Sequence, residues 1–240
     1  GNQANGSGCG VFASGSPAIV RIDNCTITGN AADADASAGG QGGGIAQDSG
    51  SEIRVADSAL ADNTAAPAAG RDCAGSIASQ GYNVVRIDDC GGFGAASGDL
   101  AGSAGAPLEA QLGPLADNGG PTLTHLPAVT SPVVDFGAPG GCSIDDDGLP
   151  GTPYVPLLAD QRGVSRPRDG DGDGFARCDV GAVEVPEPGA GAASVAAWLG
   201  LGALARRIRV RPASSWRRPS SHQASWPTSP ASRVRRARPK

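Results

Sequence analysis

The sequence predicts an all-β chain folded as a right-handed, single-stranded parallel β-helix, because one short motif is written three times in its first half. Residues 20–30 read VRIDNCTITGN, residues 53–63 repeat the apolar, arginine and asparagine positions, and residues 85–90 repeat the first six positions. Apolar and polar residues alternate within the motif, which indicates a strand with one buried face. A unit too small to bury that face alone must stack on its neighbours. We therefore expect three equivalent residues to stack in the core: Ile22, Val55 and Ile87.

A second motif, made of small residues, precedes each copy at the same offset and supports the repeat. It occupies residues 10–13, 43–46 and 75–78. Glycine and asparagine between the strands suit tight corners, because both adopt left-handed backbone conformations at low cost. We therefore assign residues 1–95 to stacked coils, which begin inside a repeat and are expected to lack their natural N-terminus. Residues 96–185, where leucines alternate with proline, glycine and aspartate, are expected to form an irregular, loop-rich capping region.

Charge is divided sharply along the chain. Residues 1–205 hold all 24 acidic groups and 8 arginines, a net charge of −16, whereas residues 206–240 hold 10 arginines and Lys240 without an acid. The acidic part repels nucleic acid and anionic lipids, which argues against either as its partner. Aromatic residues make up only 4% of the chain. The sequence therefore gives little support for a sugar-binding groove lined by tryptophan and tyrosine.

Six cysteines with only two histidines, and no CxxC spacing, favour disulfides over a metal site. Cys9 and Cys25 are 16 residues apart and Cys73 and Cys90 are 17 apart, at equivalent positions of the first and third copies. The middle copy lacks both cysteines, which argues for pairing within a coil, and the last pair follows by elimination. The predicted disulfides are Cys9–Cys25, Cys73–Cys90 and Cys142–Cys178. The alternative is a set of free, buried thiols in a cytosolic protein.

The hexapeptide DGDGDG at residues 169–174 is the sharpest chemical motif in the chain. Calcium takes about six to eight oxygen ligands, and aspartates at alternate positions with glycines between them match the first half of an EF-hand loop. Position 12 of such a loop is Val180 here, and the nearest carboxylate falls one place earlier. We expect either a calcium-stabilised turn with an irregular loop or a solvated acidic turn, and residues 145–147 are a weaker candidate. The candidate calcium ligands are Asp169, Asp171, Asp173 and Asp179.

Some parallel β-helices are polysaccharide lyases or glycoside hydrolases, so an enzyme is the main alternative to a structural or binding protein. One charged column is predicted on the coils, formed by Arg21, Arg54, Arg86, Asp23 and Asp88. These charges recur with the repeat, whereas a catalytic site is needed at one place only, so we interpret them as a solvated ladder. His125 has no serine or cysteine partner that the sequence identifies. We therefore assign no catalytic residue.

Four motifs in the second half resemble those of the choice-of-anchor Q proteins, which are bacterial exported β-helix proteins. They are LGPLADNGGPTLTHLP at residues 112–127, SPVVDFG at 131–137, DQRGVSRP at 160–167 and CDVGAVE at 178–184. The coils, with CAGSIASQGYN at residues 73–83, also fit. The resemblance implies a secreted or surface-exposed domain anchored by a C-terminal device. Three motif residues are expected to be structural, as a corner carboxylate and an arginine–carboxylate brace: Asp135, and Asp160 with Arg162.

Residues 186–207 resemble the PEP-CTERM sorting signal. Pro186, Glu187 and Pro188 precede an apolar run at residues 190–205, which is followed by Arg206 and Arg207. As a short hydrophobic helix these sixteen residues span about 24 Å, less than the roughly 30 Å hydrocarbon core of a membrane. The resemblance implies processing by an exosortase-type membrane enzyme, with the arginines cytoplasmic and the β-helix outside. The alternative is a buried apolar helix.

Residues 208–240 are rich in arginine, serine and proline without periodicity, so we expect a disordered basic tail or an out-of-frame translation. Together, these features predict a non-enzymatic, exported cell-surface or extracellular-matrix protein, adhesin-like or structural, with a transient C-terminal membrane anchor. The alternative is a β-helix polysaccharide lyase or glycoside hydrolase whose catalytic coils precede residue 1. The predicted partners are an exosortase-type enzyme and a surface polysaccharide or protein ligand, and calcium is the predicted cofactor.

Overall fold

The computed structural model describes residues 1–37, 39–66, 70–94, 98–145 and 154–188. All of them belong to one compact unit, Gly1–Ala196. Every regular element in these residues is a β-strand, so the predicted all-β class with parallel sheets is confirmed for this part of the chain. The described residues contain no helix long and apolar enough to cross a membrane.

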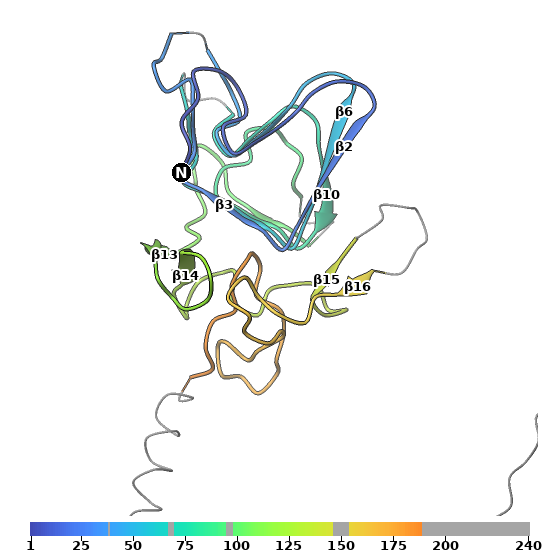
Figure 1. Cartoon of the computed structure of the whole chain (residues 1–240), viewed down its shortest axis with the longest axis vertical. Helices are drawn as coiled ribbons and strands as arrows, with labels where there is room; N and C mark the ends of the chain where they lie inside the picture. Colours follow the sequence, from blue (N-terminus) through green and yellow to red (C-terminus); the bar gives the residue numbers. More distant parts are fainter. Residues whose placement is uncertain (38, 67–69, 95–97, 146–153, 189–240) are drawn as a thin grey trace, which may run out of the picture. The chain divides into compact units, whose positions relative to one another are not determined.

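The first twelve strands form four parallel sheets. The first two passages of the chain visit all four in the same order, and the third visits the first three and then adds a further strand to the third sheet. The first sheet contains β1 (Val11–Ala13), β5 (Ile45–Gln47) and β9 (Cys73–Ala74). The second contains β2 (Ala18–Asp23), β6 (Ser51–Ala56) and β10 (Ile77–Gly81), which lie side by side in Figure 1. The third contains β3 (Thr26–Thr28), β7 (Ala59–Ala61), β11 (Val84–Val85) and β12 (Leu100–Ala101). The fourth contains β4 (Ala31–Ala32) and β8 (Thr64–Ala65).

Two antiparallel hairpins lie in the loop-rich region that follows. In the first, β13 (Leu112–Ala116) pairs with β14 (Thr124–Pro127). In the second, β15 (Ser143–Ile144) pairs with β16 (Val155–Pro156). Figure 1 shows both hairpins apart from the four parallel sheets. The other described residues between them are turns and irregular segments, as the broken leucine pattern predicts.

The first two passages keep the register that the 33-residue repeat predicts. Ile22 pairs with Val55 in the second sheet, and Ile27 pairs with Leu60 in the third. Because side chains on one face of a strand recur at every second residue, this register places the apolar residues of both copies on the same buried face.

The third passage departs from the predicted register. Ile77 pairs with Ile53, and Ser79 is the partner of Val55. Ile87 is buried but follows the third sheet instead of lying over Val55. The predicted stacking of Ile87 is therefore wrong.

Two shortened connections explain the shift: the one from the fourth sheet to the first, and the one from the first sheet to the second, where Ile45 to Ile53 spans eight residues but Cys73 to Ile77 only four. Twelve residues separate β4 from β5, whereas seven separate β8 from β9. The third passage therefore reaches each sheet earlier in the sequence, and Cys73, instead of Ile77, pairs with Ile45. The third copy of the motif then falls on the next sheet, where Val85 pairs with Leu60.

The same shift separates cysteines that the repeat made equivalent. Cys73–Cys90 and Cys142–Cys178 form disulfides, as predicted, but Cys9 and Cys25 are free thiols, so the predicted Cys9–Cys25 disulfide is wrong. Cys73 lies in the column of Val11 and Ile45, two residues beyond the column of Cys9. The two pairs of cysteines therefore do not occupy equivalent corners.

Two apolar cores lie on opposite faces of the third sheet. In β7, Leu60 belongs to the core enclosed by the parallel sheets, whereas Ala59 and Ala61 belong to a second core with Val133 and Val180 from the loop-rich region. A fully buried leucine contributes about 1.5–3 kcal/mol. The loop-rich region therefore packs along the outer face of the third sheet, where small alanine side chains allow close approach.

Two hydrogen-bonded ladders close the corners on either side of the third sheet. In each ladder, the backbone N–H of one passage donates to a side-chain oxygen of the next. Asn30 donates to Asn63 and Asn63 to Asp72, while Ser58 donates to Asn83 and Asn83 to Asp99, at 2.9–3.2 Å. Both ladders end on a largely buried aspartate. They satisfy backbone donors that would otherwise be costly to bury at the corners.

Candidate functional site

The DGDGDG loop is closed by its own carboxylates. Asp169 accepts the N–H of Gly172 at 2.7 Å through Oδ1 and the N–H of Gly174 at 3.0 Å through Oδ2. Asp171 accepts the N–H of Asp173 at 2.9 Å. These bonds curl the loop in the way that the alternating glycines predict.

The carboxylate that joins this loop comes from a distant segment. Oxygens of Asp135, Asp169 and Asp171 lie within 4.8 Å of one another. Asp135 accepts the N–H of Asp171 at 2.9 Å and the N–H of Arg177 at 3.2 Å. Burial raises the pKa of Asp135 above its usual value, against these hydrogen bonds, which lower it. The three carboxylates supply hard oxygen atoms of the kind that calcium binds, although fewer than a full coordination sphere.

Asp179 does not belong to this cluster, so its predicted role as a calcium ligand is wrong. It is completely buried. Its carboxylate accepts the N–H of Asp135 at 2.8 Å and the N–H of Val185. Burial raises the pKa of Asp179 to about 6. The side chain therefore joins two backbone segments, and its position one place before an EF-hand ligand reflects this structural role. Asp173 lies in the exposed loop outside the cluster.

A buried ionic network lies next to Asp179. The Arg166 side chain is 0% exposed, and its Nη1 lies 3.4 Å from Glu184 Oε1. Its guanidinium also donates to Gly181 O at 2.6 Å and to Asn24 Oδ1 at 3.1 Å. Burial, together with the charge of Asp179, raises the pKa of Glu184 to about 7. The network therefore connects the loop-rich region to the corner after β2.

Asp160 and Arg162 form the predicted brace. Arg162 donates to Asp160 Oδ2 through Nη2 at 2.7 Å and through Nε at 2.9 Å, and both side chains are largely buried. Burial would raise the pKa of Asp160, but hydrogen bonds from the Glu184 amide and from Arg162 hold it below its usual value. This side-on geometry fixes the turn that carries the DQRG motif.

The predicted column of charges does not form as a unit. Arg21 pairs in register with Arg54, but the partner of Arg54 on the next strand is Ala78. Arg86 follows β11 and lies 3.3 Å from Asp62. The arginines are occupied locally: Arg21 lies 3.1 Å from Asp145, and Arg54 lies 2.7 Å from Glu52. The charged column that the repeat predicts is therefore not formed by these three arginines.

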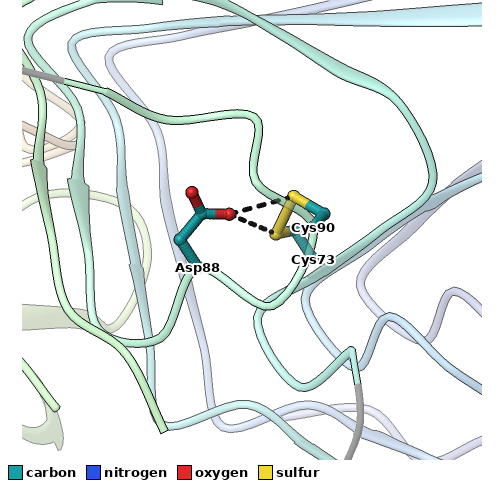
Figure 2. Close-up of side chains that lie close together, drawn as sticks. All are labelled: Cys73, Asp88 and Cys90. Atoms are coloured by element: carbon teal, nitrogen blue, oxygen red, sulfur yellow. Dashed lines mark hydrogen bonds between the residues drawn. A yellow bond between two sulfur atoms is a disulfide. The ribbon is translucent and has the colours of Figure 1, made fainter. Parts of the chain in front are cut away.

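The two acids of that column, and His125, form contacts elsewhere. Asp23 accepts the N–H of Asp145 at 3.2 Å. His125 Nδ1 lies 2.7 Å from Gly113 O within the β13–β14 hairpin. Asp88, the second acid of the predicted column, lies beside the Cys73–Cys90 disulfide (Figure 2).

Asp88 shapes the corner that carries this disulfide. Its Oδ1 lies 3.5 Å from Cys73 Sγ and 3.3 Å from Cys90 Sγ. The same carboxylate accepts the N–H of Gly91 at 2.7 Å and that of Phe93 at 3.1 Å. Because both sulfurs are bonded to each other, this cluster is a structural corner and not a metal site.

The predicted sorting signal begins at a change from buried to exposed residues. Val185 is buried, whereas Pro186, Glu187 and Pro188 are exposed. Arg206 and Arg207, and the apolar run before them, lie outside the described residues.

Comparison with protein-family models, with curated proteins and with solved structures finds no match to this chain. The resemblance to choice-of-anchor Q proteins therefore stands on the four motifs alone. Sequence reasoning missed the roles of Arg166 and Glu184, although both residues stand inside those motifs. The motifs contain no specific signal for this pair, because both hold other charged residues, and burial of an arginine or a glutamate needs a partner that only the fold supplies.

Proposed function

We propose that this chain is a non-enzymatic, exported surface or matrix protein, and that its parallel sheets are the walls of a right-handed parallel β-helix. The repeated visiting order of the four sheets supports the β-helix. The Cys73–Cys90 and Cys142–Cys178 disulfides support an oxidising compartment, because such bonds persist outside the cytosol.

The observation that carries the proposal is the abrupt change from a buried residue, Val185, to exposed residues at 186–188. Val185 is held by a hydrogen bond from its N–H to Asp179 and is 1% exposed, and the Pro-Glu-Pro motif follows at once on the surface. The two prolines keep this segment out of a helix, so an exosortase-type enzyme can reach its backbone. The adjacent apolar run and Arg206 and Arg207 then provide a transient membrane anchor with fixed orientation.

The motif residues act in this proposal as structural parts. Asp135, Asp160, Arg162 and Asp179 bond to backbone groups or to one another. Hydrogen-bonded, charge-assisted contacts of this kind hold irregular segments in place. They support a rigid loop-rich region that displays surface loops, the adhesin-like or structural role that the resemblance implies.

Mass spectrometry of the protein recovered from its host tests the sorting proposal. Cleavage near residues 186–188 is expected to remove residues 206–240 and leave a product with a net charge of about −16. Replacing Pro186, Glu187 and Pro188 by alanine should leave uncleaved protein, whereas Pro121→Ala, at another exposed proline, should not. A surface-localised form that still ends at Lys240 would refute the proposal.

We also propose that calcium binds at Asp135, Asp169 and Asp171, with Asp173 as a further loop carboxylate. A ligand that binds only the folded state raises its stability, by about 2.7 kcal/mol at 100 times the dissociation constant. Millimolar calcium is therefore expected to raise the melting temperature above its value in chelator. Asp171→Asn should abolish the shift, and the exposed Asp117→Asn should preserve it. Identical melting curves in calcium and chelator would leave a solvated acidic turn.

A further inference from the structure

Both tyrosines of the chain line one small pocket. Tyr82 follows β10, and Tyr154 immediately precedes β16. The pocket has a volume of about 230 Å³, below the roughly 300–1,000 Å³ of sites that enclose a drug-sized ligand. It therefore suits a ligand no larger than a small organic group.

The pocket walls come from two parts of the fold that are distant in sequence. Asp57 and Tyr82 belong to the corner after the second sheet and Gln80 to β10, while Ala138 and Ser143 belong to the loop-rich region. The corner is built alike on successive passages, because Asp57 and Tyr82 both have left-handed backbone conformations, with φ of 46° and 55°. An ordinary side chain rarely adopts that conformation, so the surrounding structure fixes where Tyr82 lies.

Packing also fixes the Tyr82 ring. Its centroid lies 6.2 Å from that of Phe136 at an interplanar angle of 59°, a tilted arrangement that aromatic pairs favour. Gly98 lies so close that a Cβ added there would be 3.1 Å from the ring. Tyr154, by contrast, is 53% exposed.

One wall of the pocket carries the carboxylate of Asp57. Asp57 is 6% exposed, and its Oδ1 accepts the N–H of Ala138 at 2.7 Å. It forms no ion pair with any described residue, and the described pocket lining contains no lysine, arginine or histidine. Burial raises the pKa of Asp57 to about 6; the hydrogen bond from Ala138 and the charge of Arg166 lower it, and the charge of Asp23 raises it.

From this combination we infer that the tyrosine pocket binds a small organic cation, an ammonium group of the alkylated kind, between Tyr154 and Asp57. Aromatic rings attract such cations through their electron-rich faces, and quaternary ammonium ligands are recognised by pockets of this type. A largely buried carboxylate is costly to ionise, and a cation bound beside Asp57 would lower that cost. The surrounding acidic chain would also attract a cation and repel an anion.

This inference goes beyond the proposed function, because the pocket belongs to the folded unit and does not depend on sorting. Its test therefore uses the purified full chain, and failure of the sorting experiment would not affect it. Choline chloride is the probe, titrated at constant ionic strength with sodium chloride as the compensating salt and followed by saturation-transfer NMR. Saturable binding with a dissociation constant of about 1 mM is expected for a ligand of this size.

Asp57→Asn is the decisive variant, since an amide oxygen can keep the bond from Ala138 while the charge is lost. It should weaken choline binding at least about tenfold. Tyr154→Ala should have a similar effect and Tyr154→Phe should not, because phenylalanine retains the ring. Phe175→Ala is the matched control, since Phe175 is also an exposed aromatic residue, at 69%, but lies outside the pocket.

Three results would overturn the inference. The first is no saturable choline binding by the native chain. The second is unchanged binding in both Asp57→Asn and Tyr154→Ala. The third is equally tight binding of 3,3-dimethylbutanol, the neutral analogue of choline, or of a neutral sugar such as glucose. That last result would identify an apolar or sugar-binding pocket in place of a cation site.

Discussion

Arg166→Met removes a cation that connects the loop-rich region to the parallel sheets. The Arg166 side chain is 0% exposed, and it donates to Asn24 Oδ1 at 3.1 Å and to Gly181 O at 2.6 Å. Methionine fills much of the same volume but leaves these acceptors without a donor and Glu184 without its counter-charge. Breaking a buried ion pair from one side costs about 3–5 kcal/mol, because the remaining charge stays buried.

Urea denaturation at pH 7.5, followed by circular dichroism, measures this cost. Arg166→Met should lower the free energy of unfolding by about 3–5 kcal/mol, and adding Glu184→Gln should recover part of the loss by removing the unpaired charge. Arg177→Met is the control, because Arg177 is exposed, and it should change stability by less than about 0.5 kcal/mol. A loss below about 1 kcal/mol in Arg166→Met would show that the network does not hold the two regions together.

Three further predictions concern the rest of the fold. The pKa of Glu184 is about 7 and that of Asp179 about 6, above their unfolded values near 4, so the folded state retains protons that the unfolded chain has released. The free energy of unfolding should therefore fall as pH rises from about 4 to 7, and a flat or rising urea-midpoint profile would contradict this. Asn63→Ala should cost about 1–3 kcal/mol by leaving ladder donors unpaired, measurable in the same assay, whereas an unchanged midpoint would show that the ladder is dispensable. Non-reducing peptide mapping should recover unlinked Cys9 and Cys25, and a Cys9–Cys25 peptide would refute that assignment.

The repeated motif was sufficient to predict the first two passages. Ile22 and Val55 share a column because both strands have the same length and the same turn after them. Side-chain alternation then determines which residues are buried. The Asp160–Arg162 brace was also predictable, because an aspartate and an arginine two residues apart in a glycine turn can meet through local geometry alone.

The third passage was not predictable from the motif. The sequence similarity of residues 20–25 and 85–90 is real, but five residues missing between β8 and β9, and four more missing between the first and second sheets, move the later copy onto another sheet. A repeat alignment measures similarity along the chain, whereas strand pairing depends on the accumulated length of the turns. The same error made Cys9 and Cys25 look equivalent to a disulfide-bonded pair.

Which carboxylate joins the DGDGDG loop depends on a long-range contact, which the local sequence pattern cannot predict. Asp135 joins Asp169 across 34 residues because the loop-rich region folds back on itself. Asp179 stands closer in sequence but is directed into the interior by its bonds to the amides of Asp135 and Val185. Residue spacing within a loop can predict a cluster of carboxylates only when every member of the cluster comes from that loop.

The buried network also connects folding with the proposed sorting step. Val185, the last buried residue before Pro186, is held through Asp179, while Glu184 beside it pairs with Arg166. Arg166 in turn bonds to Asn24 at the end of β2. The segment that a processing enzyme would meet is thus positioned only when the loop-rich region has docked on the parallel sheets. Under the proposed function, a chain that has not completed this docking would leave the position of its Pro-Glu-Pro motif unfixed. Cleavage would therefore favour the folded protein.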